Sequence, residues 1–279
     1  MGTAVEKAEE KTFNLVSGFE GMSEADREEY QDELDDIGGS GISAYKIKLP
    51  SGGALQFEIE TDTEGDPDYQ KEIEAVIVFT HRMNATFPKD EEGKPVLNQP
   101  PICSAVDGKT GTNFQTGKII QCEGCPYNQF GSDGRGKRCK NMRRLYLLMS
   151  GKQMPYLLTL PPTSVGDIEK ALKKIMAGSK FSYTRMVMKF KLQKIDKNGN
   201  IYSKVTMEKA GILSDEQYET VKKLRESLKR EFTNVAVSLD DYEAPEDGAR
   251  TEAPQQTAGS DDGFMNIPEG VEDSALPFN

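Results

Sequence analysis

The alternation of apolar and polar residues predicts a protein built mainly from β-strands. Successive side chains of a strand point to opposite faces, so an alternating run indicates a half-buried strand and a wholly apolar run a buried one. The run 74–80 is nearly all apolar at its centre and is therefore expected to be buried, and Asn198-Gly199 between two alternating runs is typical of a tight hairpin turn. Strands are expected on this basis at 43–49, 54–60, 74–80, 145–149, 156–160, 183–195 and 200–210.

Helical periodicity appears at two places within this pattern. Apolar residues three or four positions apart share one face of a helix, which predicts a helix from about 165 to 177. Its apolar face consists of Ile168, Leu172 and Ile175. A second amphipathic helix is expected from Asp215 to Phe232, with Ser214 before it as the N-cap residue.

Charge divides the chain into an acidic start, a basic centre and an acidic end. Residues 1–38 carry 12 acids and 3 bases, and residues 240–279 carry 11 acids and a single base. The formal net charge of −11 therefore leaves residues 39–239 with a net charge of +8. A uniformly acidic protein would repel a polyanion, whereas this distribution permits the centre to bind one.

These patterns predict a mainly β protein with added helices, of the α+β class, in three parts. We expect one or two short acidic helices in 1–38, a folded core in 39–239 with an insertion at about 100–144, and a disordered acidic tail in 240–279. The order of strands, with a helix before the last hairpin, suits a small β-barrel of the oligonucleotide-binding type. A two-domain α+β protein suits the same order.

The sequence also predicts where the protein resides. No apolar run approaches the length of about 18–20 residues that a membrane span requires. The first residues lack the basic region and the apolar core of a secretory signal. We therefore expect a cytoplasmic protein without a membrane partner, in a compartment where cysteines bind metal more often than they form disulfides.

All four cysteines lie in one Gly-rich window, which predicts a metal site. Cys122 and Cys125 form a CxxC knuckle, and Cys103 and Cys139 flank it. Four thiolates are the usual ligands of a closed structural zinc site, and a Gly-rich loop gains stability from a bound ion. We predict one structural Zn²⁺ held by all four; an iron–sulfur cluster uses the same ligands and remains an alternative. The single histidine, His81, is expected to be structural.

Cations surround the last cysteine and, with two aromatic residues, predict a nucleic-acid contact. Positive charge neutralises phosphates, and flat rings stack on unpaired bases. A charge run alone is usually a solvated face, so the aromatic residues and the metal-held loop are what favour binding. The predicted contact residues are Tyr127, Phe130, Arg135, Lys137, Arg138, Lys140, Arg143 and Arg144.

The last hairpin predicts a second contact surface. Its alternation places Met186, Met188, Phe190, Leu192, Ile201, Val205 and Met207 toward the core, and turns Val187 outward. The outward aromatic and basic residues are predicted to contact nucleic acid: Tyr183, Arg185, Lys189, Lys191, Tyr202 and Lys204. Because no helix is strongly basic on one face, we expect single strands rather than a duplex as the ligand.

The basic centre and the tail together resemble bacteriophage single-stranded DNA-binding proteins. The resemblance covers about 40–210 as architecture and 240–279 as an acidic tail that ends in Leu276-Pro277-Phe278. It implies a protein that coats and protects single-stranded DNA during phage replication and recombination in the host cytoplasm. It further implies that Leu276, Pro277 and Phe278 recruit replication and recombination enzymes. Asn279 departs from the pattern, because it moves the terminal carboxylate one residue beyond the phenylalanine.

Two other classes of function are compatible with parts of the sequence. A zinc-stabilised transcription accessory protein that contacts RNA polymerase is the main alternative. An enzyme is not expected, because the chain has neither a histidine cluster nor a phosphate-binding Gly-Lys-Ser/Thr loop. The preference for DNA or RNA and the oligomeric state, monomeric or cooperative on DNA, are left open by the sequence.

Overall fold

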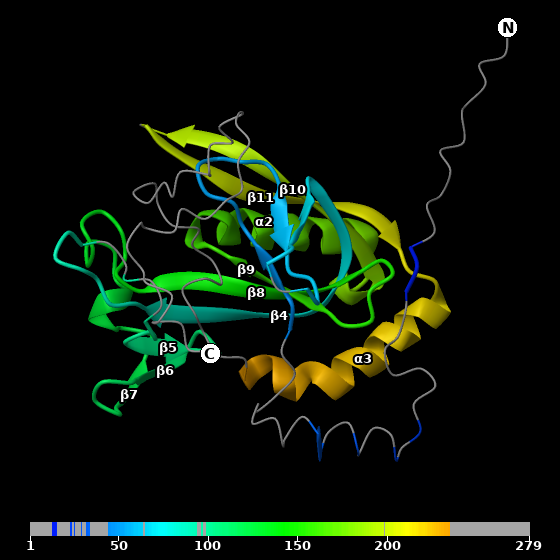
Figure 1. Ribbon diagram of the computed structural model, residues 1–279, viewed down its shortest axis with the longest axis horizontal. Coiled ribbons are helices and arrows are strands. Elements are labelled where there is room, and N and C mark those ends of the chain that lie inside the picture. Colours follow the sequence, from blue (N-terminus) through cyan, green and yellow to red (C-terminus); the bar gives the residue numbers. More distant parts are fainter. Residues whose placement is uncertain are drawn as a thin grey trace, which may run out of the picture. The chain divides into compact units, whose positions relative to one another are not determined.

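A computed structural model of the chain describes most of the predicted core (Figure 1). The described residues are 13–15, five single positions between 23 and 33, and 44–234 apart from 64, 94–95, 97–98 and 198. Three predictions lie wholly or largely outside them: the acidic N-terminal helices, the turn at Asn198, and the tail with its Leu276-Pro277-Phe278 tip.

All the strands and both helices predicted for the core are present. The strands are β1 (Lys46–Lys48), β2 (Phe57–Ile59), β3 (Asp68–Gln70), β4 (Glu72–Thr86), β5 (Cys103–Ala105), β6 (Thr110–Asn113), β7 (Ile119–Gln121), β8 (Lys140–Met149), β9 (Tyr156–Leu160), β10 (Met186–Lys197) and β11 (Asn200–Ile212). The α-helices are α2 (Pro162–Ser179) and α3 (Asp215–Asn234), and η1 (Pro126–Asn128) and η2 (Tyr183–Arg185) are 3₁₀-helices. Strands β3, β5, β6 and β7, of three or four residues each, were not predicted, because unlike β1 and β2 they do not lie within a longer alternating run.

The strands form one open sheet around the long strand β4. The order along the sheet is β3-β2-β1-β9-β8-β4-β5-β6-β7. One edge of β4 pairs with β8, and the other pairs with β10 near its start and with β5 near its end. Among the described residues no strand pairing joins β11 to β3, so the sheet does not close. The broad prediction of a mainly β, α+β protein is confirmed.

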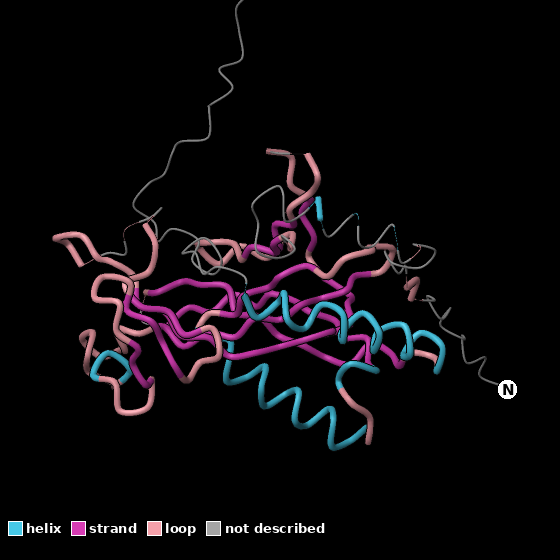
Figure 2. Tube along the Cα trace, turned by 90° about the horizontal axis from the view of Figure 1, so that it is seen from below, coloured by secondary structure: helices cyan, strands magenta, loops and turns pink. Residues whose placement is uncertain are grey.

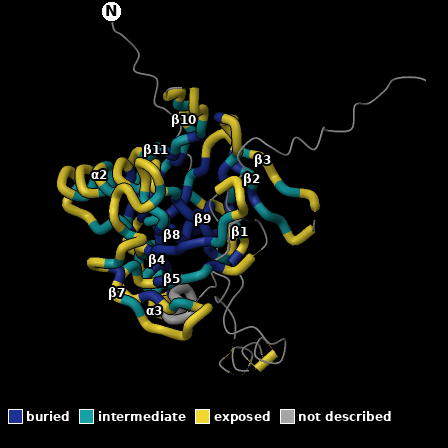
Figure 3. Tube along the Cα trace, turned by 90° about the vertical axis from the view of Figure 1, so that its left-hand side faces the viewer, coloured by how far each residue is buried: buried dark blue, intermediate teal, exposed yellow. Residues whose placement is uncertain are grey.

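Helices cover both faces of the central strands, which explains why the run at 75–78 is wholly apolar. Ala75 and Ile77 belong to the core cluster against which α2 packs. Val76 packs instead with Val221 of α3, and Val78 lies in a cluster with Leu224 of the same helix. Figure 2 shows both long helices next to the strands, and Figure 3 shows the buried strands β4, β8 and β9 inside an exposed rim.

The start of α3 follows from its sequence. The Ser214 hydroxyl accepts a hydrogen bond from the Gln217 amide at 3.2 Å, and the Gln217 side chain accepts one from the Ser214 amide at 3.1 Å. This reciprocal capping satisfies backbone donors that the first helical turn leaves unpaired. The amphipathic helix predicted after Ser214 is therefore confirmed.

The hairpin of β10 and β11 corrects part of the predicted alternation. Val187 was expected to face solvent, but α3 covers that face and buries it. Ile201 was expected to face the core, but it is 43% exposed near the tip of the hairpin. A register irregularity follows Val187. The strand pattern identified the paired residues, whereas the covering helix decided which of them are buried.

Gly53, in the turn between β1 and β2, lies against the β10–β11 hairpin. Its φ is +75°, and a Cβ added there would lie 2.6 Å from the Ile201 Cγ2 atom. We expect Gly53→Ala to lower the free energy of unfolding by about 1–3 kcal/mol, measured by urea denaturation. Gly65 is a matched control, because its φ is +79° and no atom lies within 4 Å of an added Cβ. Equal costs for the two substitutions would show that the contact is unimportant.

Candidate nucleic-acid interface and cysteine pocket

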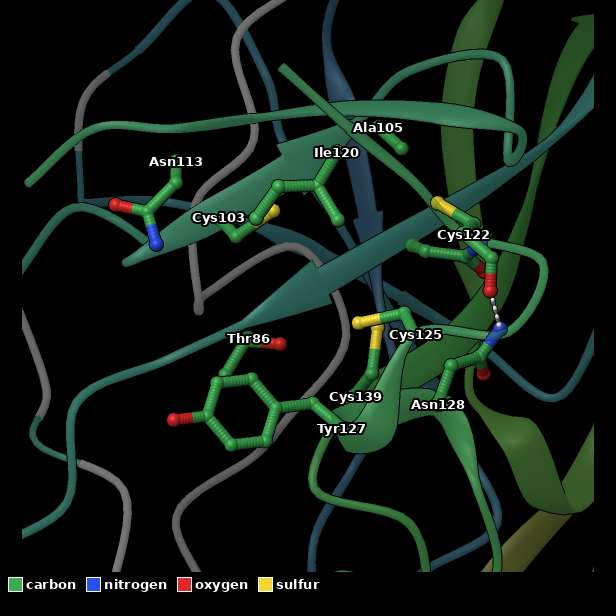
Figure 4. A pocket seen from close by; sticks show the side chains of 11 residues that line it. Thr86, Cys103, Ala105, Asn113, Ile120, Cys122, Cys125, Tyr127, Asn128 and Cys139 are labelled. Carbon is green, nitrogen blue, oxygen red and sulfur yellow. Dashed lines mark hydrogen bonds between the residues drawn. The ribbon is translucent and has the colours of Figure 1, made fainter. Parts of the chain in front are cut away.

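The four cysteines line a single pocket at one end of the sheet (Figure 4). We call residues 103–139, which contain β5, β6, β7 and η1, the cysteine lobe. Cys103 begins β5, which pairs with the end of β4, while Cys139 immediately precedes β8. Between them Gly124, at a φ of +76°, makes the turn that carries Cys122 and Cys125 to the same cavity. The cavity measures about 30 Å³, enough for one ion or water molecule.

Hydrogen bonds hold the knuckle around this pocket. The Asn128 side chain donates to the Cys122 carbonyl at 3.0 Å, and the Asn128 amide donates to the Cys125 carbonyl at 2.9 Å. The Cys139 amide donates to the Tyr127 carbonyl at 2.8 Å, which ties η1 to the start of β8. The sequence predicted that these cysteines come together, and all four line this one pocket.

The electrostatics of the pocket suit a bound cation. The pKa of the Cys139 thiol is raised to about 11, chiefly by burial and also by the other three cysteines, although a hydrogen bond with the Thr86 side chain opposes the change. Burial also raises the pKa of Cys103, as do Cys122 and Cys125. Four thiolates in one pocket would repel one another unless a positive ion lay between them.

The donor set therefore fits a structural zinc ion, since four thiols and no carboxylate or histidine line the cavity. In the described part of the chain, however, no group of three or more Cys, His, Asp or Glu side chains is arranged so that it could hold a metal ion. The four sulfurs share a pocket without being drawn together to ligand distances. The zinc site remains a prediction.

Part of the predicted basic surface lies on this lobe. Arg135 is exposed, as are the rings of Tyr127 (52%) and Phe130 (81%). The Lys137 ammonium lies 5.0 Å from the centre of the Phe130 ring. The Arg138 guanidinium donates to the Phe87 carbonyl at 2.9 Å.

A chain of asparagines positions Lys137. Its ammonium donates to the side-chain oxygens of Asn141 and Asn128, at 3.1 and 3.3 Å. The Asn141 side chain in turn donates to Asn84 of β4 at 2.7 Å and to Asn128 at 2.9 Å. Neutral partners hold this lysine in place without cancelling its charge.

The rest of the predicted basic loop is a strand, and this corrects the prediction for Arg143 and Arg144. Both lie in β8 together with Lys140, which is half-buried. Arg144 is fully buried. Arg143 is 16% exposed and donates to Glu169 at 2.8 Å, so neither arginine offers a free guanidinium to a ligand. The sequence did not show that Lys140–Arg144 forms a strand rather than a loop, because a segment with a single apolar residue has no recognisable alternation.

Glu169 of α2 joins the helix to two strands of the sheet. Its carboxylate accepts hydrogen bonds from Arg143 and, at 2.9 and 2.6 Å, from Arg82 of β4. The hydrogen bonds from Arg82, and then those from Arg143, lower the pKa of Glu169 to about 2 although burial opposes the change. The ionised carboxylate is thus the form that the folded state stabilises.

We expect Glu169→Gln to lower the free energy of unfolding at pH 7 by about 1–3 kcal/mol, because two guanidinium groups lose their counter-charge. A lowered folded-state pKa means that the stabilisation is complete above the ordinary carboxyl pKa and is lost as the pH falls from about 4.5 toward 2. The wild type and the variant should therefore converge in stability over that pH range, measured by denaturation at a series of pH values.

Glu208→Gln provides the comparison for this experiment. Glu208 is 61% exposed and forms a surface ion pair with Lys191 at 3.3 Å. Surface pairs contribute about 0–1 kcal/mol, so this variant should change stability little at any pH. A Glu169 variant that also changes little would mean that the carboxylate does not fasten α2.

As predicted, three lysines of the β10–β11 hairpin point toward solvent, but each of them forms an ion pair with a carboxylate. Each of the three makes at least one ion pair with a neighbouring strand or with α2. The pairs are Lys189 with Glu74 at 2.9 Å, Lys191 with Glu72 at 3.1 Å and with Glu208 at 3.3 Å, and Lys204 with Asp167. Tyr202, beside them, is half-buried. The alternation predicted which face these residues occupy, but it contained no sign of their partners.

Tyr183 and Arg185 do not belong to this face, which is a further correction. They form η2, and the strand begins only at Met186. The Arg185 guanidinium lies 4.8 Å from the centre of the Phe181 ring and 5.3 Å from that of Tyr218, and it forms an ion pair with Asp215. These contacts attach α3 to the sheet rather than present Arg185 to a ligand.

Two exposed apolar residues of the lobe were missed from the sequence. Phe114 and Ile119, at the tip of the β6–β7 hairpin, are 58% and 73% exposed. The segment 113–118 contains the turn residues Asn113 and Gly117, which were the available signal for a hairpin. Their neighbours Asn113 and Ile120 line the cysteine pocket, so the hairpin turns alternate side chains to the pocket and to solvent.

No protein-family model matches the sequence, and no curated protein matches it. The function is therefore inferred from the residues and their geometry. Within the described residues, none of the helices has the length and apolar character needed to cross a membrane.

Proposed function

We propose that the protein binds single-stranded DNA, coats and protects it during replication and recombination, and has no enzymatic activity. The cysteine lobe carries the proposal, because one pocket lined by four cysteines supports exposed rings beside cations. Rings that stack on bases and cations that meet phosphates are the two elements of single-strand binding. The net charge of +8 over residues 39–239 provides the long-range attraction.

The shape of the lobe favours single strands over duplex. Tyr127 lies in the 3₁₀-helix η1, and Phe130 follows it in a loop. Neither belongs to a basic α-helix of the kind that enters a major groove. Base faces become accessible to a ring only when the bases are unpaired, so the exposed aromatic residues select single strands.

The fold and the metal are part of the same proposal. We infer a half-open barrel of the oligonucleotide-binding type, in which the sheet curls around the core cluster and α2. One structural Zn²⁺ would be held by Cys103, Cys122, Cys125 and Cys139. When bound, the ion cross-links η1, β5 and the start of β8, which keeps the lobe rigid.

The acidic tail gives the protein its proposed second role. Residues 240–279 carry a net charge of −10 and end in an apolar tip. Such a segment competes with DNA for the basic core and recruits replication and recombination enzymes once DNA displaces it. Leu276, Pro277 and Phe278 are the residues proposed to enter a partner's pocket.

Fluorescence titration with single-stranded DNA, duplex DNA and RNA across a salt series tests the function. We expect preferential binding of single strands, with an affinity that falls steeply as salt rises because counterions are released. Tight binding to duplex, or none to any nucleic acid, would reject the proposal. Binding to RNA polymerase without any affinity for single strands would favour a transcription accessory protein.

A further inference from the structure

We infer that the principal base-stacking surface is the outer side of the cysteine lobe, formed by Phe114, Tyr127 and Phe130 with Lys118 and Lys137, and that the β10–β11 face is not the main contact. This inference rests on the proposed binding of single-stranded DNA and names the surface that performs it. Two of the five residues, Phe114 and Lys118, lie on the β6–β7 hairpin.

The lobe concentrates exposed apolar side chains. Eleven large apolar residues are exposed among the described residues, and five of them lie within the 37 residues of the lobe. The five are Val106, Phe114, Ile119, Tyr127 and Phe130. A small lobe that holds almost half of them does not bury its apolar side chains as a core would, which indicates a binding surface.

The cations of the lobe favour an anionic ligand. Residues 103–139 contain five cations and three carboxylates, a net charge of +2 with the cysteines counted as neutral. Of the carboxylates, Asp133 is held by Lys89 at 2.6 Å, and Asp107 accepts the backbone amides of Lys109 and Thr110 at 2.7 and 2.8 Å.

Ion pairing distinguishes the lysines of the lobe from the lysines of the hairpin face. Among the described residues no carboxylate lies within ion-pair distance of Lys118, and Lys137 is held by neutral asparagines. Lys189 and Lys191, by contrast, face Glu72, Glu74 and Glu208. DNA would have to displace those carboxylates before its phosphates could replace them, whereas the lobe offers its charge directly.

The hairpin that carries Phe114 is held in shape before any ligand arrives. The Asn113 side chain accepts hydrogen bonds from the Gln115 and Thr116 amides, both at 3.0 Å. The Phe114 amide donates to the Ile102 carbonyl at 2.8 Å, next to Cys103. A hairpin whose backbone is fixed in this way loses little conformational entropy when a base stacks on its exposed ring.

Alanine substitution of each ring tests the assignment, with a labelled oligothymidylate of about 30 nucleotides as the probe. Phe114→Ala, Tyr127→Ala and Phe130→Ala should each weaken binding by about 5- to 150-fold, the range found for base–aromatic stacking. Tyr69→Ala is the matched control, because Tyr69 of β3 is 55% exposed but lies outside the lobe. It should leave the affinity unchanged.

Charge substitutions separate the two surfaces. Lys118→Gln and Lys137→Gln should each lower the slope of log affinity against log salt by about 0.7, the value for one phosphate contact on a single strand. Lys189→Gln and Lys191→Gln should leave the slope unchanged. The reverse result would overturn the inference and assign binding to the hairpin face.

Photocrosslinking of the wild type to an oligonucleotide containing 5-iodouracil tests the surface without any substitution. Crosslinked peptides from 110–130 would support the inference, and crosslinks confined to 186–212 would overturn it. A wild-type protein that binds no single strand would reject the proposed function itself. Single-strand binding that none of the three ring substitutions weakens would reject only the location.

Discussion

Removing the proposed Zn²⁺ is expected to unfold the cysteine lobe while the rest of the core stays folded. The purified protein should contain one zinc per chain by elemental analysis, and Cys139→Ser or a strong chelator should remove it. Structural zinc contributes about 10–16 kcal/mol in zinc-finger peptides, so its loss should destabilise the lobe by about 5 kcal/mol or more. Hydrogen exchange measured peptide by peptide would show protection lost in 103–139 alone.

The packing of the core explains why unfolding should be limited to the lobe. The largest core cluster, which includes Phe57, Leu158 and Phe190, contains no cysteine, and neither does the cluster that α3 covers. We therefore expect those buried apolar residues to hold the sheet together without the lobe. Protein that contains no metal and keeps full protection in 103–139 would reject the zinc site. A stoichiometric amount of iron with visible absorbance would identify a cluster instead.

Deleting residues 240–279 should strengthen binding to single-stranded DNA at low salt by about 10- to 100-fold. The deletion removes a net charge of −10 that competes with phosphates for a core of charge +8. The difference should disappear above roughly 0.5 M salt, where charges more than a few ångströms apart are screened. Titration of both proteins over a salt series measures the effect, and equal affinities at low salt would reject the competition.

Removing only the apolar tip of the tail separates its two proposed roles, which are competition with DNA and recruitment of partner enzymes. A chain that lacks 276–279 keeps every acid of the tail, so its DNA affinity should match that of the wild type. It should nevertheless lose binding to the replication or recombination enzyme that recognises Leu276-Pro277-Phe278. Restoring those three residues without Asn279 would show whether the terminal carboxylate must follow the phenylalanine directly.

The sequence alone located the strands and helices of the core and the grouping of the four cysteines. Both depend on local patterns, because alternation sets the faces of a strand and a short Gly-rich segment brings its cysteines together. The prediction for 75–78 succeeded for this reason, as did the helix after Ser214. The short strands β5 and β7 were missed, because no longer alternating run surrounds them as one surrounds β1 and β2.

The tertiary structure decided which charged and apolar side chains are available to a ligand. Arg144 belongs to a cationic run, yet it is fully buried in β8, where it pairs with β4 on one side and with β9 on the other. Lys189 and Lys191 lie on the predicted face, yet carboxylates from β4 and β11 oppose them. Exposure and ion pairing depend on residues far apart in sequence, and no local pattern contains them.

The sequence and the tertiary structure therefore determined different properties of this protein. Sequence determined the segregation of charge, the β character of the core and the cysteine window, since each is a property of neighbouring residues. Only the tertiary structure distinguished the cysteine lobe, with exposed rings at Phe114 and Phe130, from the neutralised hairpin face. The physical reason is that burial and electrostatic pairing arise from packing between elements, and packing exists only once the chain has folded.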